Sequence, residues 1–176
     1  MTVGRRSLLL GASLYALPAR AADFPEKPIT LVVPFAAGGA IDVMARLLGD
    51  RASRALGQPV VIENRGGAAG LIGAASVARA EPDGYTLLLA SAAQVTIPPW
   101  INRSLTFDPP KDLAPVVHLV DTPMVLVVSP RSSFRTVGDF IAAARAQRGG
   151  LNYASTGVGT ISNLVMESLK IGRAHV

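Results

Sequence analysis

The residues best suited to hold a ligand follow a short apolar stretch near the start of the chain. Ile29–Val33 has the composition of a strand buried on both faces. Gly38 and Gly39 come next, where we expect a turn with positive φ that leaves backbone N–H groups uncovered. A helical pattern begins at Ile41, with Asp42 in its first turn. A helix N-terminus with free N–H groups attracts anions, so this stretch predicts a site for a carboxylate.

A second unit of the same order lies near the end of the sequence. Residues 151–155 predict a strand, residues 156–160 contain two glycines, and a helix is expected from Ile161. Two such units can face each other across a cleft when they belong to two lobes. The sequence therefore predicts a two-lobed protein that closes on its ligand.

Between these units the pattern alternates strands with helices. The expected helices are residues 41–56, ended by Gly57, residues 69–80, and residues 136–146, ended by residues 149–150; the expected strands are residues 60–63, 85–90, 116–120 and 124–129. Thr136 and Asp139 resemble a capping box. This alternation predicts βαβ crossovers, a largely parallel sheet and an α/β fold, with residues 91–115 as an irregular passage between lobes.

The first 21 residues have the form of a signal peptide. Arg5 and Arg6 precede an apolar core that is too short to span a bilayer, and Ala19-Arg20-Ala21 supplies a cleavage site. Adjacent arginines also occur in twin-arginine signals, so both the Sec and the twin-arginine routes stay open. Either route predicts export to the periplasm, with residues 1–21 removed.

Composition argues against several classes of function. The chain has 17 basic and 12 acidic side chains, but three arginines leave with the signal peptide and the others are scattered without aromatic neighbours. A nucleic-acid partner is therefore not expected. The absence of cysteine excludes disulfides and thiolate chemistry, and an apolar content of 49% without a second long apolar run indicates a globular protein.

Enzyme and cofactor sites have weaker support. A serine hydrolase needs a base beside its nucleophile, and the two histidines are His118, inside an expected strand, and His175, at the end of the chain. The Gly-x-Ser-x-Gly motif does not occur. The glycines between Gly66 and Gly73 lack the spacing of a dinucleotide fingerprint, so we interpret them as close helix–sheet packing. We expect no catalytic residue, metal or cofactor.

Asp42 has two interpretations. The structural one is a carboxylate stabilised by the dipole of the helix in whose first turn it lies, and the functional one is an acceptor for a ligand or a bridging water. A carboxylate within a carboxylate site would repel its ligand, which favours the structural interpretation. Thr156, Thr160 and Ser162 are ordinary loop and cap residues as well as candidates for ligand contact.

Several motifs together resemble the substrate-binding proteins of tripartite tricarboxylate transporters, the Bug (TctC-like) family of periplasmic solute receptors. The matching segments are residues 28–35, 38–39, 42, 45–46, 56–61, 63–65, 82–87 and 151–155. The resemblance implies a type II periplasmic binding protein with a first lobe in residues 22–100 and a second in residues 101–176. It also implies a monomeric receptor that delivers a small carboxylate to membrane transporter subunits or, as the alternative, to a sensor kinase.

Carried over residue by residue, the resemblance places the ligand between residues 35–42 and residues 155–162. The implied ligand contacts are Phe35, Ala37, Gly38, Gly39 and Asp42 in the first loop and Ser155, Thr156, Gly157, Thr160 and Ser162 in the second. Departures from the family pattern occur at Ala36 or Ala37 (often proline), near Val158 (asparagine) and at Asn163 (histidine). They border the ligand and leave its identity open.

The end of the sequence also departs from the family. Its members are longer than this chain, and residues 171–176 resemble a translated sequencing adapter, so we expect them not to be native. We also expect residues 22–176 alone to leave apolar faces uncovered, to be poorly soluble and to bind no ligand.

Overall fold

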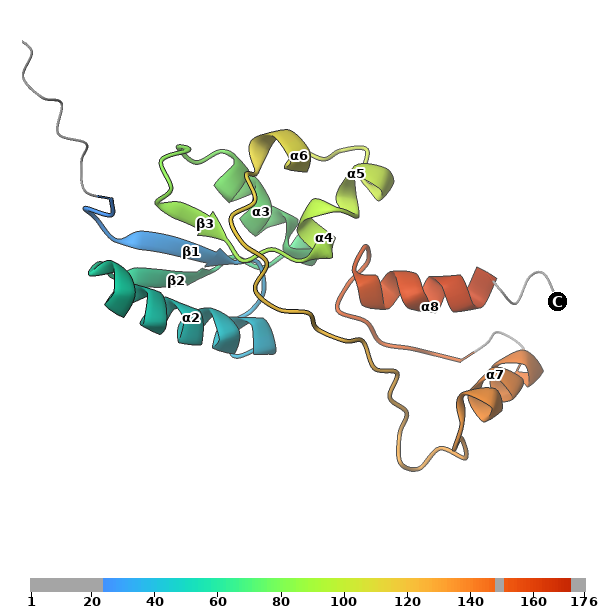
Figure 1. The fold of residues 1–176 in the computed structure, drawn as a ribbon. Coiled ribbons are helices and arrows are strands. Elements are labelled where there is room, and N and C mark those ends of the chain that lie inside the picture. The colour runs from blue at the N-terminus through green and yellow to red at the C-terminus, as the bar shows by residue number, and fades with distance from the viewer. Residues whose placement is uncertain (1–23, 148–150, 172–176) are drawn as a thin grey trace, which may run out of the picture.

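Three parallel strands form the sheet around which the described part of the chain is built (Figure 1). The computed structural model describes residues 24–147 and 151–171. β1 (Ile29–Val33) lies between β2 (Val60–Asn64) and β3 (Thr86–Leu88) and pairs with both in parallel. The parallel sheet agrees with the sequence prediction. The predicted signal peptide, residues 149–150 and residues 172–176 lie outside the described residues.

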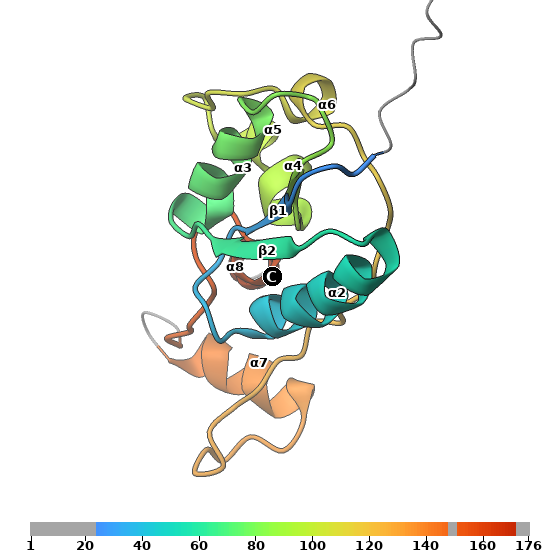
Figure 2. The same cartoon turned by 90° about the vertical axis from the view of Figure 1, so that its left-hand side faces the viewer.

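β1 is buried on both faces, as its composition predicts. Its four aliphatic residues are between 0% and 4% exposed. Successive side chains of a strand point to opposite faces, and β1 has aliphatic residues on both, so both faces must be covered. α2 (Ala40–Leu56) packs on one side of the sheet and α3 (Leu71–Ala78) on the other, and a second view shows this arrangement (Figure 2).

Two apolar clusters form the core. In the first, Leu31 and Val33 of β1 pack with Ala45 of α2. In the second, alanines of α3 pack with Phe107. Burying an aliphatic or phenylalanine side chain contributes about 1.5–3 kcal/mol. The two clusters therefore hold one helix against each side of the sheet.

The end of α2 follows its sequence signal. Gly57 has φ +69° and donates its N–H to the Ser53 carbonyl (3.1 Å). The Ser53 hydroxyl donates to the Gly49 carbonyl (2.7 Å) and accepts the Val60 N–H (2.8 Å). The predicted helix end is confirmed, and this serine ties it to the start of β2.

Residues 91–113 are more regular than the sequence predicted. They contain three short helices, which are α4 (Ala92–Val95), α5 (Pro98–Ile101) and α6 (Pro109–Asp112). Trp100 on α5 is 86% exposed, whereas Phe107 is buried against α3. The lobe boundary at residue 100 stays a prediction, and the packing of Phe107 and Leu113 on α3 favours a boundary after Leu113.

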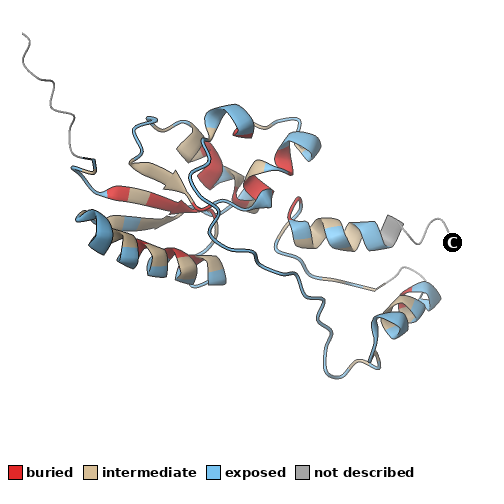
Figure 3. Ribbon diagram, in the orientation of Figure 1, coloured by how far each residue is buried: buried red, intermediate tan, exposed pale blue. Residues whose placement is uncertain are grey.

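The strands predicted at residues 116–120, 124–129 and 151–155 are wrong. These segments are extended chain without strand pairing, and they are largely exposed (Figure 3). Val125 and Val127 are 79% and 81% exposed. A strand needs a neighbour for its backbone hydrogen bonds, and none within the described residues pairs with these segments. Their composition is typical of strands, but a strand forms only where another segment of chain lies beside it, and composition does not show whether one does.

α7 (Val137–Ala146) and α8 (Ile161–Ile171) complete the described chain. The predicted capping box of α7 is confirmed, since Asp139 N–H donates to Thr136 Oγ1 (3.1 Å) and Thr136 N–H donates to Asp139 Oδ2 (2.9 Å). A mainly apolar cavity of about 60 Å³ lies between α7, α8 and residues 151–153. The helices of the described residues are all too short or too polar to cross a bilayer.

Candidate functional site

The carboxyl ends of β1, β2 and β3 meet at one edge of the sheet, because the strands are parallel. The loops that follow them begin at residues 34, 65 and 89. In open α/β sheets ligands bind at this edge, where loops present N–H groups at helix N-termini. The loop before α8 reaches the same edge, since a Cβ on Gly157 would lie 3.9 Å from Ala69 Cβ. Four loops therefore gather here, of which the sequence predicted two.

The first predicted loop is open to solvent. Ala37, Gly38 and Gly39 are exposed, and Phe35 is half-buried against the first core cluster. Gly38 has the expected positive φ (+86°), but the prediction for Gly39 is wrong, because Gly39 has φ −77° and ψ 167°. Gly39 is the N-cap of α2, a position that takes extended backbone. No side chain within the described residues caps it, so the first N–H groups of a 17-residue helix lack this partner.

Asp42 is buried beneath this loop. Its Oδ2 accepts the Gly38 N–H (2.8 Å) and the Arg46 Nε–H (3.0 Å), and its Oδ1 accepts from Asn64 Nδ2 (3.0 Å). The Asn64 amide also donates to the Phe35 carbonyl (3.2 Å). Hydrogen bonds from Arg46, Gly38 and Asn64 lower the pKa of Asp42 to about 2. Because internal donors occupy both oxygens, these contacts favour the structural interpretation. They also give Asp42 a role that the sequence did not indicate, which is to hold the first loop through the Gly38 N–H.

The dependence of stability on pH tests this role of Asp42. A carboxyl with a lowered folded pKa adds stability that is present above its ordinary pKa of 3.8 and is lost as the pH falls to about 2. We expect Asp42→Asn to be less stable than the parent at neutral pH and to lose less stability between these values in urea denaturation. Asp50→Asn is the matched control, because exposed Asp50 also pairs with an arginine four residues on (3.0 Å). If Asp42→Asn lost as much stability as the parent between pH 3.8 and about 2, the assignment would be contradicted.

The structure brings together the predicted residues of the second loop. The Ser162 hydroxyl lies 3.0 Å from the hydroxyls of Thr156 and Thr160. Thr160 is buried and donates to the Gly157 carbonyl (2.7 Å), and the Ser155 hydroxyl accepts the Gly157 N–H (3.4 Å). The loop is therefore held by its own side chains. Direct contact of these residues with a ligand stays a prediction.

A chain of polar groups supports the second loop and was not predicted. Gly159 N–H donates to Asn163 Oδ1 (3.3 Å), and Asn163 Nδ2 donates to the Tyr153 hydroxyl (2.9 Å). The Tyr153 hydroxyl donates in turn to Glu167. The loop is thus tied to side chains of α8. The only signal in the sequence was the departure from the family pattern at Asn163.

Residues 67–70 form a turn that, together with the preceding Gly66, contacts both predicted loops. A Cβ on Gly66 would lie 3.6 Å from the backbone N of Ala36 in the first loop, and the turn's Ala69 faces Gly157 in the second. The sequence indicates a turn over residues 64–67 but not its contacts with the two loops. Residues 69–70 fall in the helix expected over residues 69–80, which divides here into the 3₁₀ helix η2 (Ala68–Gly70) and α3.

The glycines of this region pack against the end of β1. A Cβ on Gly70 would lie 2.9 Å from Pro34 Cβ, and one on Gly73 would lie 3.3 Å from the same atom. These distances are shorter than ordinary carbon–carbon contacts of about 3.5–4.0 Å. The interpretation of these glycines as close helix–sheet packing is therefore confirmed.

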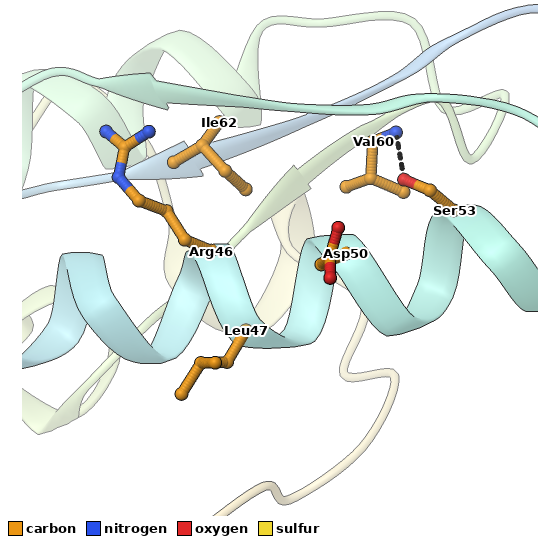
Figure 4. A pocket seen from close by; sticks show the side chains of 6 residues that line it. All are labelled: Arg46, Leu47, Asp50, Ser53, Val60 and Ile62. Carbon is orange, nitrogen blue, oxygen red and sulfur yellow. Dashed lines mark hydrogen bonds between the residues drawn. The ribbon is translucent and has the colours of Figure 1, made fainter.

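A surface depression of about 480 Å³ lies between α2 and the edge strand β2 (Figure 4). Its lining includes Arg46, Leu47 and Asp50 from α2 and Val60 from β2. Arg46 is the residue that pairs with Asp42, and none of the predicted ligand contacts lines this depression. We therefore place the candidate site at the loops and not here.

The remaining candidates for chemistry are few. His118 Nε2 lies 3.2 Å from Asp121 Oδ1, and both side chains are largely exposed, so His118 is a surface histidine. His175 lies outside the described residues. Across residues 24–147 and 151–171 no cluster of three or more histidine, aspartate or glutamate side chains could hold a metal ion.

A parallel sheet, an uncapped helix N-terminus and a second glycine loop at the same edge are typical of α/β proteins that bind small ligands. The chain belongs to the TctC family, since the family model described as "Tripartite tricarboxylate transporter family receptor" matches residues 44–174. The family and the fold are those of solute-binding receptors, which confirms the resemblance seen in the sequence.

Relatives of known sequence agree with this assignment. A UPF0065 protein of Bordetella bronchiseptica is 39% identical over 93% of this chain and 49% of its own length. Protein BugT of Bordetella pertussis is 38% identical over 89% of this chain and 48% of its own length. The chain spans about half the length of the curated relatives it matches.

Solved structures confirm the fold class. The periplasmic binding protein BugD superposes with a TM-score of 0.77 at 34% identity, over 86% of this chain and 50% of its own. R. palustris Rpa4515 with adipate gives a TM-score of 0.77 at 35% identity, over 84% of this chain and 50% of its own. A structure described as a periplasmic transporter gives 0.78 at 40% identity, over 86% of this chain and 51% of its own.

Proposed function

We propose that this protein is a periplasmic receptor that captures a small carboxylate and delivers it to the membrane subunits of a tripartite tricarboxylate-type transporter. The observation that carries the proposal is the exposed N-terminus of α2, which has no side-chain cap within the described residues. A ligand carboxylate takes the place of that cap, where N–H groups and the helix dipole both favour negative charge. The solved structure of Rpa4515 with adipate supports a ligand of this class.

The roles of the loop residues follow from their positions. Phe35, Ala37, Gly38 and Gly39 border the first anion site, and Asp42 holds their loop. Ser155, Thr156, Gly157, Thr160 and Ser162 border the ligand from the second loop. The first loop belongs to a lobe that includes the sheet, and the second belongs to another lobe. We propose that the two lobes close on the ligand and that the receptor acts as a monomer in the periplasm.

We also propose that the protein does not transform its ligand. Membership of a receptor family supports this proposal. The exposed pairing of His118 with Asp121, in an extended segment that no described strand pairs with, supports it further. Capture and release then require only that the lobes open again.

Thermal-shift and calorimetric titration of the complete gene product tests the proposal. We expect saturable stabilisation by adipate or another aliphatic di- or tricarboxylate, because a ligand that binds only the folded state adds about 2.7 kcal/mol at about 100 times its Kd. Adipamide, which has the same length without charge, is the matched control and should give no shift. Equal binding of adipamide would contradict the anion site, and turnover of a bound acid would contradict a receptor.

A further inference from the structure

Gln94 is a fully buried polar side chain that neither predicted loop contains. It lies on the four-residue helix α4 and has no exposed surface. Its Oε1 accepts the Ser91 N–H (2.9 Å) and the Ser91 hydroxyl (2.8 Å), which forms the cap of α4. Its Nε2 donates to the carbonyl of Ala69 (2.6 Å), 25 residues away. The cap of α4 uses only the Oε1 atom of Gln94, so the Nε2 atom is free of the cap and bonds to Ala69 instead.

The nitrogen is bonded to a turn in an unusual conformation. Gly67, Ala68, Ala69 and Gly70 all have positive φ, with values of +113°, +48°, +56° and +90°. Alanine is disfavoured in the left-handed region, so two successive alanines there persist only when tertiary contacts hold them. Gln94 supplies such a contact, and a Cβ on Gly70 would come within 2.3 Å of its Nε2.

This turn is the place where the two candidate ligand loops meet. Gly66, next to the turn, approaches the backbone of Phe35 and Ala36 at 3.6 Å, measured from a Cβ built on the glycine. Ala69 approaches Gly157 in the second loop. A shift of the turn would therefore move the surface against which both loops lie.

We infer that Gln94 is a positioning residue for the ligand site: its amide nitrogen holds the turn of residues 67–70 in the conformation against which both loops pack. This inference rests on the proposed function of those loops. It assigns no ligand contact to Gln94, which is buried behind the turn. Its side-chain hydrogen bonds within the described residues are to Ala69 and Ser91, and neither of these residues carries a charge.

Two substitutions separate the donor from the acceptor. Gln94→Glu keeps the oxygen that caps α4 but cannot donate to Ala69 when ionised, and it regains a donor when protonated. Burial raises the pKa of a carboxyl group, so lowering the pH protonates this one and restores the donor. Gln94→Met keeps the length and removes all three side-chain hydrogen bonds at every pH. Ser91→Ala is the matched control, because it weakens the cap and leaves the bond to Ala69 intact.

The first readout needs no ligand. The Gly70 N–H donates to the Gly67 carbonyl across the turn (2.9 Å), so its hydrogen-exchange protection reports whether the turn is formed. In the complete gene product we expect Gln94→Met to lower this protection about tenfold or more and Ser91→Ala to lower it far less. Gln94→Glu should resemble Gln94→Met at neutral pH and recover toward the parent in acid. Unchanged protection in Gln94→Met overturns the inference.

The second readout is adipate affinity at equal stability. We expect both Gln94 variants to bind adipate about tenfold more weakly at neutral pH, with recovery in acid only for Gln94→Glu. The inference is also overturned if a variant that has lost the hydrogen-exchange protection of the Gly70 N–H still binds adipate as tightly as the parent. If the parent itself binds no carboxylate, the proposed function fails, and the exchange readout still decides whether Gln94 positions the turn.

Discussion

Alanine at Gly70 is expected to lower the free energy of unfolding by about 2–5 kcal/mol. Two costs combine at this position. The backbone has φ +90°, and a Cβ would lie 2.3 Å from Gln94 Nε2 and 2.9 Å from Pro34 Cβ. Neither neighbour can withdraw, because both side chains are fully buried. Urea denaturation followed by far-UV circular dichroism measures the loss.

Gly57→Ala is the matched control for this substitution. Gly57 also has a left-handed backbone, with φ +69°, but a Cβ there would meet no atom within 4 Å. Its replacement should therefore cost only the conformational part, about 1 kcal/mol. An equal loss for the two variants would show that the contact of Gly70 with Gln94 and Pro34 does not contribute, and would also weaken the role inferred for Gln94.

Residues 24–176 on their own are expected to self-associate through residues 124–129. This run is extended, uncharged and rich in β-branched residues, and it has no strand partner within the described residues. Such segments pair with copies of themselves. Lysine at both Val125 and Val127 should raise the concentration of soluble monomer about tenfold or more, because like charges oppose stacking of identical strands.

Sedimentation velocity and light scattering measure this effect. The control is the pair Thr96→Lys and Ser168→Lys, which adds the same charge at exposed polar positions outside the run. It should leave association nearly unchanged. Equal gains from both pairs would mean that net charge, and not the valine-rich run, limits solubility.

The sequence predicted those parts of the fold that short-range signals determine. The composition of Ile29–Val33 indicated a strand buried on both faces, and Gly57 marked the end of α2 because a left-handed residue commonly ends a helix. The capping box at Thr136 and Asp139 likewise depends on residues three positions apart. In each case the deciding contacts lie within a few residues or follow from composition alone.

Features that depend on distant residues were missed or wrong. The strands expected at residues 116–129 require partners, and their composition does not say whether a partner is present. Two successive alanines at positive φ have no sequence signal, because alanine favours the opposite region. The hydrogen bond from Gln94 to Ala69 joins residues 25 positions apart, so no local sequence pattern predicts it. The two loops of the candidate site were therefore predicted, but the conformation of residues 67–70 and their contacts with both loops were not.

Trp100 lies where its fluorescence can report on movement of the second loop. It is the only tryptophan in the chain, and it lies on α5 with its indole in solvent. The next residue, Ile101, touches the second loop, because its Cδ1 lies 2.8 Å from where a Cβ of Gly159 would be. Any displacement of that loop changes the surroundings of the indole's immediate neighbour. Intrinsic fluorescence and its quenching by acrylamide can therefore follow the loop without a label.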